Sequence, residues 1–322
     1  MRAFDELYLR CARRHEQAHG KLSDQGFVEL LAAVTKDPES FATHPEEKAF
    51  LELADAIARF ERDLGNDDLL DDDAYAAHAE ERRQSMAETC RRIGEECPAC
   101  LDARTIAVLM SSLGPDEILS ELLDIDDGLE MLMPSMDVMM GGSAWDDVFL
   151  RPRLRLMAAI ARMFMETARY AMAIGVCEEL LELCPGDELG AHQTLALACV
   201  RLENEDRFYL IARRHEEDAW YYLGNALLLY KLDRLPAARR ALMGLATQCR
   251  GGAYALLRPI FVESYLPDRP TYEPGSFEEA VLAVHEADPI VVDSPDFINW
   301  ASSQPGFVDA AKAFADREGF DW

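Results

Sequence analysis

Two cysteines separated by two residues, Cys97 and Cys100, form the arrangement in this chain that most directly fits metal chemistry. A zinc ion needs four ligands, and one such pair supplies only two. Cys11 and His15 would complete the set if the fold brought them close. We favour the alternative that Pro98 starts a helix at an inter-helix turn and that Cys100 packs against its neighbour. A redox role lacks support, because no βαβ pattern surrounds the pair.

Two acidic stretches, at 67–73 and 124–128, invite comparison with calcium sites. A helix–loop–helix calcium site needs ligands at positions 1, 3 and 5, glycine at 6 and glutamate at 12. Counted from Asp124, Gly128 falls at position 5 and Ser135 at position 12, so the pattern fails. We interpret both stretches as solvated loops and acidic helix starts, and we expect no metal and no cofactor.

Catalytic motifs are missing from the sequence. It contains no GxSxG, no glycine-rich phosphate loop with lysine and no HExxH. The seven histidines are scattered, and His192 beside Gln193 fits a surface or groove better than general-base chemistry. We therefore predict that the protein is not an enzyme. The alternative that stays open is an enzyme or metal-binding protein with its site in the N-terminal helical half.

Composition narrows the classes of partner. The chain has 322 residues, 49% of them hydrophobic, so it can bury a core. Its net charge of −28 disfavours nucleic acid and anionic membranes. Neither a signal peptide nor a membrane-spanning run is recognisable, and eight cysteines are too few for a disulfide scaffold. We expect a cytoplasmic protein with a protein or peptide partner; its oligomeric state stays open.

Helical periodicity dominates the chain and predicts an all-α fold. Phe27, Leu30, Leu31 and Val34 share one helix face, and further helices are predicted at 49–60, 74–96, 99–113 and 115–123. No alternating strand pattern with hairpin turns occurs. We divide the chain into an acidic N-terminal helical region (1–123), an acidic Met-rich connector (124–149), degenerate repeats (150–250) and a C-terminal capping segment (251–322).

The region 150–250 contains three helix–turn–helix units, each with a small residue midway along its first helix. The small residues are Ala161, Ala196 and Gly224 in the first helices, and Ala173 and Ala238 in the second helices. Together with Tyr170 and Pro185 they resemble the tetratricopeptide repeat, although their spacing is unequal. The expected fold class is thus a helical-repeat, tetratricopeptide-like α-solenoid with an N-terminal helical extension and a C-terminal cap.

A further resemblance depends on the order of several landmarks. These are ECPACLDARTIAVL, Trp145 ahead of RPRLR, AWYYLGNALLLYKL, LPDRPTYEPGSFEEAV and the late Trp300. Their order resembles that of the suppression-of-tumorigenicity-7 protein family and its soluble bacterial tetratricopeptide-repeat relatives. The resemblance implies a helical-repeat protein without catalytic residues. The chain differs from the membrane-bound members because it has no transmembrane segment, and its first 70 residues show no landmark.

Counting from the small residues predicts which positions face the inner groove of the repeats. These positions are Arg155, Ala158, Arg162 and Glu166, then Gln193, Leu197 and Arg201, and then Tyr221, Asn225 and Leu229. The set contains three arginines and one glutamate, so the face would be locally basic. Arginine forms forked hydrogen bonds with carboxylates, and asparagine or tyrosine can fix a peptide backbone.

We therefore assign partner binding to six of these residues: Arg155, Arg162, Gln193, Arg201, Tyr221 and Asn225. The hypothesis is a non-enzymatic protein–protein interaction scaffold that binds a partner in the concave face of its repeats. The expected ligand is an acidic segment or a free C-terminus. Two alternatives stay open: the arginines pair with glutamates of adjacent helices, or the chain's own acidic segment at 124–147 occupies the face.

Prolines shape the expectation for the C-terminal segment. Pro259, Pro267 and Pro270 predict an extended course over 251–270. Helix is expected to resume after Ser276, which precedes two glutamates as a helix N-cap. We expect this segment to cover the end of the last repeat.

Overall fold

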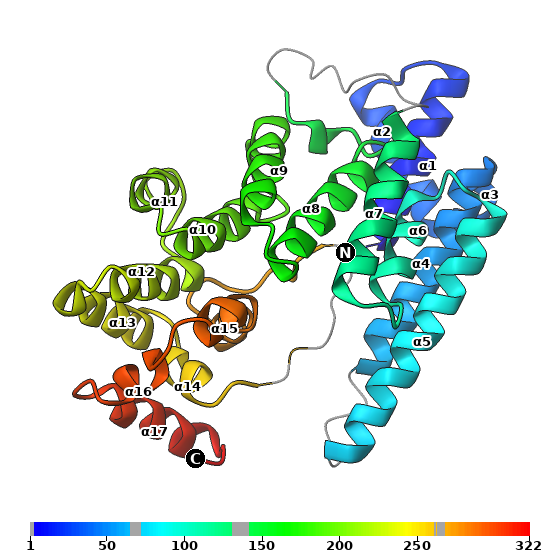
Figure 1. Ribbon diagram of the computed structural model, residues 1–322. Coiled ribbons are helices and arrows are strands. Elements are labelled where there is room, and N and C mark those ends of the chain that lie inside the picture. Colours follow the sequence, from blue (N-terminus) through cyan, green and yellow to red (C-terminus); the bar gives the residue numbers. More distant parts are fainter. Residues whose placement is uncertain (1–2, 65–71, 131–141, 261, 263–267) are drawn as a thin grey trace. The chain divides into compact units, whose positions relative to one another are not determined.

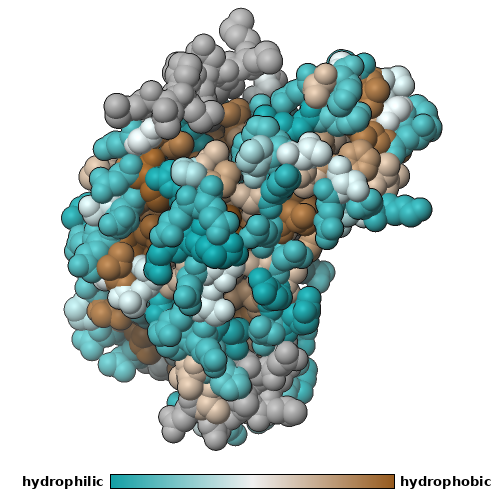
Figure 2. All heavy atoms as spheres, turned by 90° about the vertical axis from the view of Figure 1, so that its right-hand side faces the viewer, coloured by the Kyte–Doolittle hydropathy of each residue, from teal (hydrophilic) through white to brown (hydrophobic). Residues whose placement is uncertain are grey.

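The structure, a computed structural model, describes residues 3–64, 72–130, 142–260, 262 and 268–322. Within these residues the regular elements are seventeen α-helices and one short 3-10 helix, without any strand (Figure 1). The all-α prediction is confirmed for these residues, and the 3.6-residue apolar period explains it. No described helix combines the length and apolar content needed to cross a bilayer. Hydrophilic side chains predominate on the face in Figure 2.

The chain divides into two compact units. Unit 1 comprises Met1–Met163, Leu183–Glu188 and Tyr265–Asp268, and unit 2 comprises Phe164–Glu182, Leu189–Ser264 and Arg269–Trp322. The boundary falls inside the continuous helix α8 (Arg151–Glu166), whereas we placed the start of the repeats at residue 150. No glycine or proline interrupts α8 after its first turn, so the sequence of this helix carries no sign of the boundary.

Unit 1 is built on four packed helices. Its helices in chain order are α1 Ala3–His19, α2 Asp24–Lys36, α3 Pro38–Phe41, α4 Pro45–Leu64, α5 Asp72–Glu96, α6 Leu101–Leu109 and α7 Pro115–Glu130, followed by η1 Ala144–Asp146 and most of α8. Helix α4 packs on α1 and α5, and α5 packs on α6. Buried side chains such as Leu7, Phe50, Ile57 and Ile106 form the core of this unit.

Helix α7 extends into the segment that we assigned to the connector. It ends at Glu130 rather than near residue 123. Leu119, Leu122 and Ile125 are buried at helical spacing, so the apolar stripe continues past the expected end. The stretch 124–128 is therefore helical and is not a calcium-binding loop. Residues 131–141 and 65–71 lie outside the described residues, as do the predictions made for them.

Unit 2 continues the helical pattern. Its helices are the end of α8, α9 Tyr170–Leu183, α10 Ala191–Arg201, α11 Glu205–Ala212, α12 Ala219–Lys231, α13 Leu235–Gln248, α14 Gly252–Leu257, α15 Phe277–Val292, α16 Phe297–Ser302 and α17 Phe307–Glu318. Helix α10 packs on α11 and α12, and α12 packs on α13 and on α15 (Figure 1).

One turn geometry recurs three times in unit 2. Ala168, Glu203 and Asp233 adopt left-handed φ angles of 58°, 56° and 56° between α8 and α9, α10 and α11, and α12 and α13. In each turn the next N–H donates to the carbonyl five residues earlier: Arg169 to Phe164 (2.7 Å), Asn204 to Cys199 (2.9 Å) and Arg234 to Leu229 (2.8 Å). This is the Schellman ending of a helix. The three helix pairs thus share one connection despite their unequal spacing.

The predicted small residues lie where helices approach closely. A Cβ added at Gly224 would lie 3.2 Å from the Phe208 ring and 3.4 Å from Val200. The alanines at the corresponding positions, Ala161 and Ala196, are buried, as is Ala238 in α13. Larger side chains there would push the paired helices apart.

The C-terminal segment is helical earlier than expected. We predicted an extended course from residue 251, but α14 forms over Gly252–Leu257 because no proline occurs before Pro259 and Gly251 starts the helix at φ 68°. The predicted start of α15 is confirmed, since Ser276 accepts from the Glu279 N–H at 3.2 Å. Helices α14 and α17 both contact α13.

Candidate functional site

The six predicted partner-binding residues do not define one surface. Arg155 and Arg162 belong to unit 1, whereas Gln193, Arg201, Tyr221 and Asn225 belong to unit 2. Arg162 is half-buried on α8. Within unit 2, the four residues point to two different sets of neighbours, which are described separately below.

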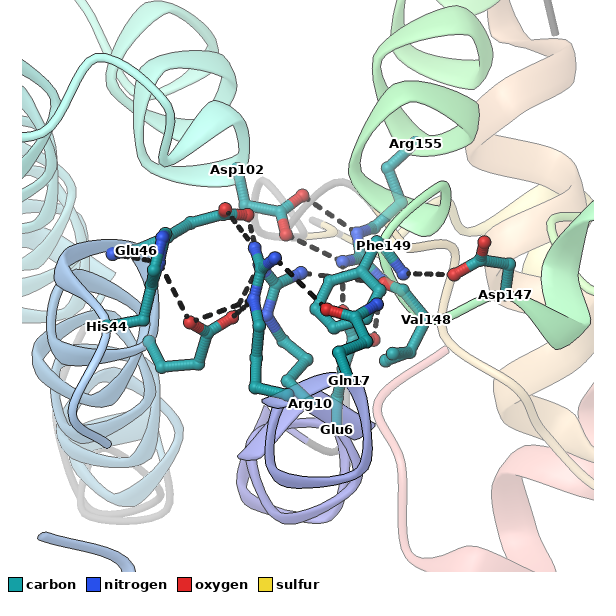
Figure 3. A network of polar contacts seen from close by, with 12 residues as sticks. Glu6, Arg10, Gln17, His44, Glu46, Asp102, Asp147, Val148, Phe149 and Arg155 are labelled. Atoms are coloured by element: carbon teal, nitrogen blue, oxygen red, sulfur yellow. Dashed lines mark hydrogen bonds and ion pairs between the residues drawn. The ribbon is translucent and has the colours of Figure 1, made fainter. Parts of the chain in front are cut away.

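Arg155 is a correction to the predicted site. Its side chain is fully buried, and it donates to both oxygens of Asp102 (2.8 and 2.6 Å) and both oxygens of Glu6 (2.9 and 2.7 Å). Figure 3 shows the guanidinium reaching from α8 toward these two carboxylates. The prediction was wrong because the two carboxylates come from α1 and α6, which are distant from Arg155 in the sequence. They leave no face of Arg155 for a partner.

The two carboxylates that accept from Arg155 differ in the direction in which folding shifts their pKa. Burial would raise the pKa of Glu6, but Arg155, Arg10 and Arg151 more than offset this effect and lower it. Burial raises the pKa of Asp102, and the attraction of Arg155 offsets this only in part. The Asp102 and Glu6 charges, in turn, keep Arg155 protonated against its own desolvation. The cluster is a structural tie between α1, α6 and α8.

A group of three possible metal ligands also lies in unit 1. His44, Glu46 and Glu47 offer ligand atoms within 4.8 Å of one another. Arg10 and Arg14 already hold these carboxylates; Arg14 Nη2 lies 2.7 Å from Glu46 Oε2, and Arg10 also bonds Glu46. Two guanidinium groups beside the ligands oppose a divalent cation. We therefore assign the group to the ion-pair network drawn in Figure 3.

The cysteines of the CxxC motif lie in a turn before α6. Cys100 N–H donates to the Cys97 carbonyl at 2.9 Å, and α6 begins at Leu101 rather than at Pro98. Burial and the nearby Asp102 raise the pKa of Cys100 to about 12. Burial likewise raises the pKa of Cys11 to about 11. These raised pKa values disfavour a nucleophilic thiolate at either cysteine near neutral pH.

Gln193 and Arg201 on α10 bind other parts of unit 2. Gln193 Nε2 donates to Asp218 (2.8 Å) and its Oε1 accepts from Arg269 (2.7 Å). Arg201 pairs with Asp293, at the end of α15, and its Nε donates to the Tyr170 hydroxyl at 3.2 Å. The carboxylate that we expected from a partner is thus supplied to Arg201 by the chain itself.

Arg269 is the centre of a polar cluster that the sequence interpretation missed. Its guanidinium donates to Glu286 on α15 (2.9 and 3.0 Å) and to the Thr194 hydroxyl on α10 (2.7 Å). Trp220 Nε1 donates to the same Glu286 at 2.8 Å. These bonds attach α15 to α10 and α12, and α15 also packs on both helices.

Tyr221 and Asn225 on α12 instead line an open groove of about 490 Å³. The groove runs over α11, α12 and α13, all in unit 2. Its lining comprises Tyr209, Glu217, Tyr221, Tyr222, Asn225, Leu229, Arg234, Ala237, Arg240, Ala241 and Gly244. The predicted groove positions of unit 2 therefore separate into two groups. Gln193 and Arg201 on α10 bond Asp218, Arg269 and Asp293, whereas Tyr221, Asn225 and Leu229 on α12 line the groove over α11 and α13. Trp220, one position before Tyr221, instead bonds Glu286 of α15.

The aromatic wall of the groove is held in place by close packing. The Tyr221 ring stacks on Phe208 at 6.0 Å, with an interplanar angle of 11°, and contacts Tyr222 at 5.3 Å. A Cβ at Gly244 would lie 2.7 Å from the Tyr222 ring, so glycine is required there. Burial raises the pKa of both Tyr209 and Tyr221, which keeps their hydroxyls protonated at neutral pH.

Charged residues mark the rim of the groove. Arg234 pairs with Glu205 on α11, and Glu217 accepts from the Tyr222 hydroxyl at 2.6 Å. Arg240 donates to the Pro236 carbonyl of its own helix at 3.1 Å. The repeat pattern alone did not predict Tyr209 or Arg240, because it places residues of the second helices outside the groove. It also did not select Tyr222, which lies on the first helix α12 but next to the counted position Tyr221. The adjacent arginines 239 and 240 beside a small-residue stripe were the available signal.

Comparison of the chain with protein-family models, with curated proteins and with solved structures finds no match in any of the three. The function is therefore inferred from the residues and the geometry of the chain itself.

Proposed function

We propose that the protein is a non-enzymatic interaction scaffold that binds a peptide segment of a partner protein in the groove over α11, α12 and α13. The observation that carries this proposal is the lining of the groove: three tyrosine rings, one side-chain amide and a floor of small residues. Aromatic rings and amides are side chains that proteins use to hold peptides at interfaces. The groove replaces the inner face of the repeats as the binding surface that we propose.

The location follows from what already covers the opposite side of the helix pair. Helix α15 packs on α10 and α12, and it bonds to Arg269, Trp220 and Arg201 through Glu286 and Asp293. A partner on that face would have to displace these bonds and the buried apolar side of α15. The α11–α13 groove can be reached without displacing any described helix.

We further propose that these helices are degenerate tetratricopeptide-like repeats of an α-solenoid. The recurring turn at Ala168, Glu203 and Asp233 and the buried small residues support this assignment. A solenoid stacks helix pairs and presents extended surfaces to partners. The resemblance to the suppression-of-tumorigenicity-7 family remains a proposal that rests on the sequence landmarks.

A reducing compartment such as the cytoplasm is the setting we propose. All eight cysteines are free thiols, and all but Cys97 are buried. Burial raises the pKa of Cys184 to about 11 and of Cys199 to about 12. These thiols pack as small hydrophobic groups and not as nucleophiles, which supports a role in binding over a role in catalysis.

The test compares partners captured by matched variants. Ala241, half-buried in the groove floor, is changed to Trp, and Met172, which is 53% exposed on α9, is changed to Trp as the control. Quantitative mass spectrometry of proteins captured from the native source should show partners retained by Met172→Trp and lost by Ala241→Trp. If both variants, folded by circular dichroism, capture the same partners as the original chain, the groove is not the binding site.

A further inference from the structure

We infer that the groove binds an internal, extended segment with an acidic side chain, whose backbone is held by Asn225 and whose carboxylate is held by Arg240. This inference rests on the proposed function and adds the chemistry of the ligand. Three features of the groove carry it: a side-chain amide donor, one cation that has no carboxylate partner among the described residues, and a floor of small residues.

Asn225 provides the donor. Its Oδ1 accepts from the Tyr209 hydroxyl at 2.9 Å, and its Nδ2 has no hydrogen-bond partner among the described residues. The bond to Tyr209 fixes the orientation of the amide, and the half-buried Nδ2 is then left to donate. A peptide carbonyl is the ligand group that satisfies such a donor whatever the ligand sequence.

Arg240 provides the charge. Of the three charged residues that line the groove, Arg234 is paired with Glu205, and Glu217 is bonded to Tyr222. Arg240 bonds only a carbonyl of its own helix, and no carboxylate among the described residues pairs with it. In a protein of net charge −28, this exposed arginine is the place where an acidic ligand gains a charge-assisted bond.

The floor determines the shape of the ligand. Ala237, Ala241 and Gly244 follow one another along α13 and span about 10 Å at 1.5 Å per residue. An extended chain covers that length with about three residues. In a helical ligand the interior backbone carbonyls are bonded within the helix, so an extended chain is the form that offers a carbonyl to Asn225. The rings of Tyr221 and Tyr222, which also line the groove and meet at an interplanar angle of 68°, provide an aromatic surface for an apolar side chain next to the acidic one.

The experiment uses three libraries of fluorescein-labelled, amidated nonapeptides, which differ only in a central block of three residues. The block holds Asp or Glu, Asn or Gln, or Lys, and Leu or Phe flanks it in each library. Fluorescence polarisation with the full chain should show the acidic library binding at least about tenfold more tightly than the amide library. This preference should weaken with added salt.

Two variants separate the parts of the inference. Arg240→Glu should remove the acidic preference and favour the Lys library, whereas Arg239→Glu, on the exposed neighbour outside the lining, should change the affinities far less. Asn225→Ala should weaken the acidic and amide libraries by a similar factor, because it removes a backbone contact. A further probe is the acidic library with a free C-terminus in place of the amide. If this library binds and the amidated libraries do not, the ligand group is a terminal carboxylate.

Each outcome bears on the inference. Equal binding of acidic and amide libraries, an unchanged preference in Arg240→Glu, binding of the free C-terminus alone, or no binding of any library would overturn it. The proposed function survives any of these results if Ala241→Trp still loses its captured partners, and it fails on its own if that variant keeps them.

Discussion

The hydroxyl of Tyr209 donates to Oδ1 of Asn225 across 2.9 Å and so joins α11 to α12 at the groove. Tyr209→Phe removes this bond and should lower the free energy of unfolding by about 0.5–1.5 kcal/mol. It should also weaken binding of the acidic peptide library, because the Asn225 amide is then free to rotate. Urea unfolding and fluorescence polarisation measure the two effects. Unchanged affinity in the folded variant would show that the orientation of Asn225 does not matter for binding.

The buried Arg155 cluster should behave as a structural element. Arg155→Met leaves Asp102 buried without its cation and Glu6 with only the more distant Arg151 at 3.7 Å, and it should cost unit 1 about 3–5 kcal/mol. Arg155→Lys should recover little, since one ammonium cannot form both forked pairs. Urea denaturation of each variant gives these differences.

A triple variant provides the control for this cluster. Combining Arg155→Met with Glu6→Leu and Asp102→Leu removes the guanidinium and its two closest carboxylates, leaves only the more distant Arg151 and Asp268, and should restore part of the lost stability. A loss below about 1 kcal/mol in Arg155→Met alone would contradict the assignment of the cluster to folding.

Acid should weaken unit 1 through Glu6. Because the folded-state pKa of Glu6 lies below its ordinary value of 4.5, the unfolded chain binds more protons in that range, and stability falls as pH drops below about 4.5. Asp102 contributes to the pH dependence of stability in the opposite direction, because burial raises its folded-state pKa above 3.8. Glu6→Gln should therefore flatten the fall in unfolding free energy between pH 5 and pH 3 in urea titrations. Equal slopes in both proteins would exclude this role of Glu6.

The repeated turn contains a strained residue that glycine should relieve. Ala168 adopts φ 58°, where an L-residue is disfavoured by about 1–2 kcal/mol, and glycine loses about 0.5–1 kcal/mol in chain entropy. Ala168→Gly should thus raise stability by about 0.5–1 kcal/mol. Ala313→Gly, at an exposed site inside α17, should instead lower it by about 1 kcal/mol. If thermal unfolding shows that Ala168→Gly and Ala313→Gly both destabilise the protein, Ala168 is not strained.

Local pattern was sufficient to predict the helices but not their packing partners. The apolar period located α2, α4 and α5, and Ser276 marked the start of α15. It did not show that α7 continues to Glu130, because the burial of Ile125 depends on tertiary packing. The end of α6 at Leu109 and the short α14 were also missed, in these cases because both boundaries depend on the geometry of local turns.

The candidate site could be predicted only in part, because local periodicity does not show which distant residues pack together. Tyr221 and Asn225 do line one groove, because counting from Gly224 places them on one helix face. Arg155 was misassigned because its partners lie 149 and 53 residues away along the chain, a distance over which periodicity carries no information. Arg201 faces Asp293 of α15, which no pattern within the repeats indicates.

The most direct test of the account is to map where a bound partner touches the chain. A photo-crosslinking phenylalanine analogue is placed at position 237 in the groove floor, at position 197 on α10, or at the exposed position 172 on α9. After partner capture, illumination and mass spectrometry, crosslinks to one partner segment should come from position 237 and not from positions 197 or 172. Crosslinks from position 197, with none from position 237, would contradict binding in this groove. They would indicate instead that the partner binds on the face that α15 covers.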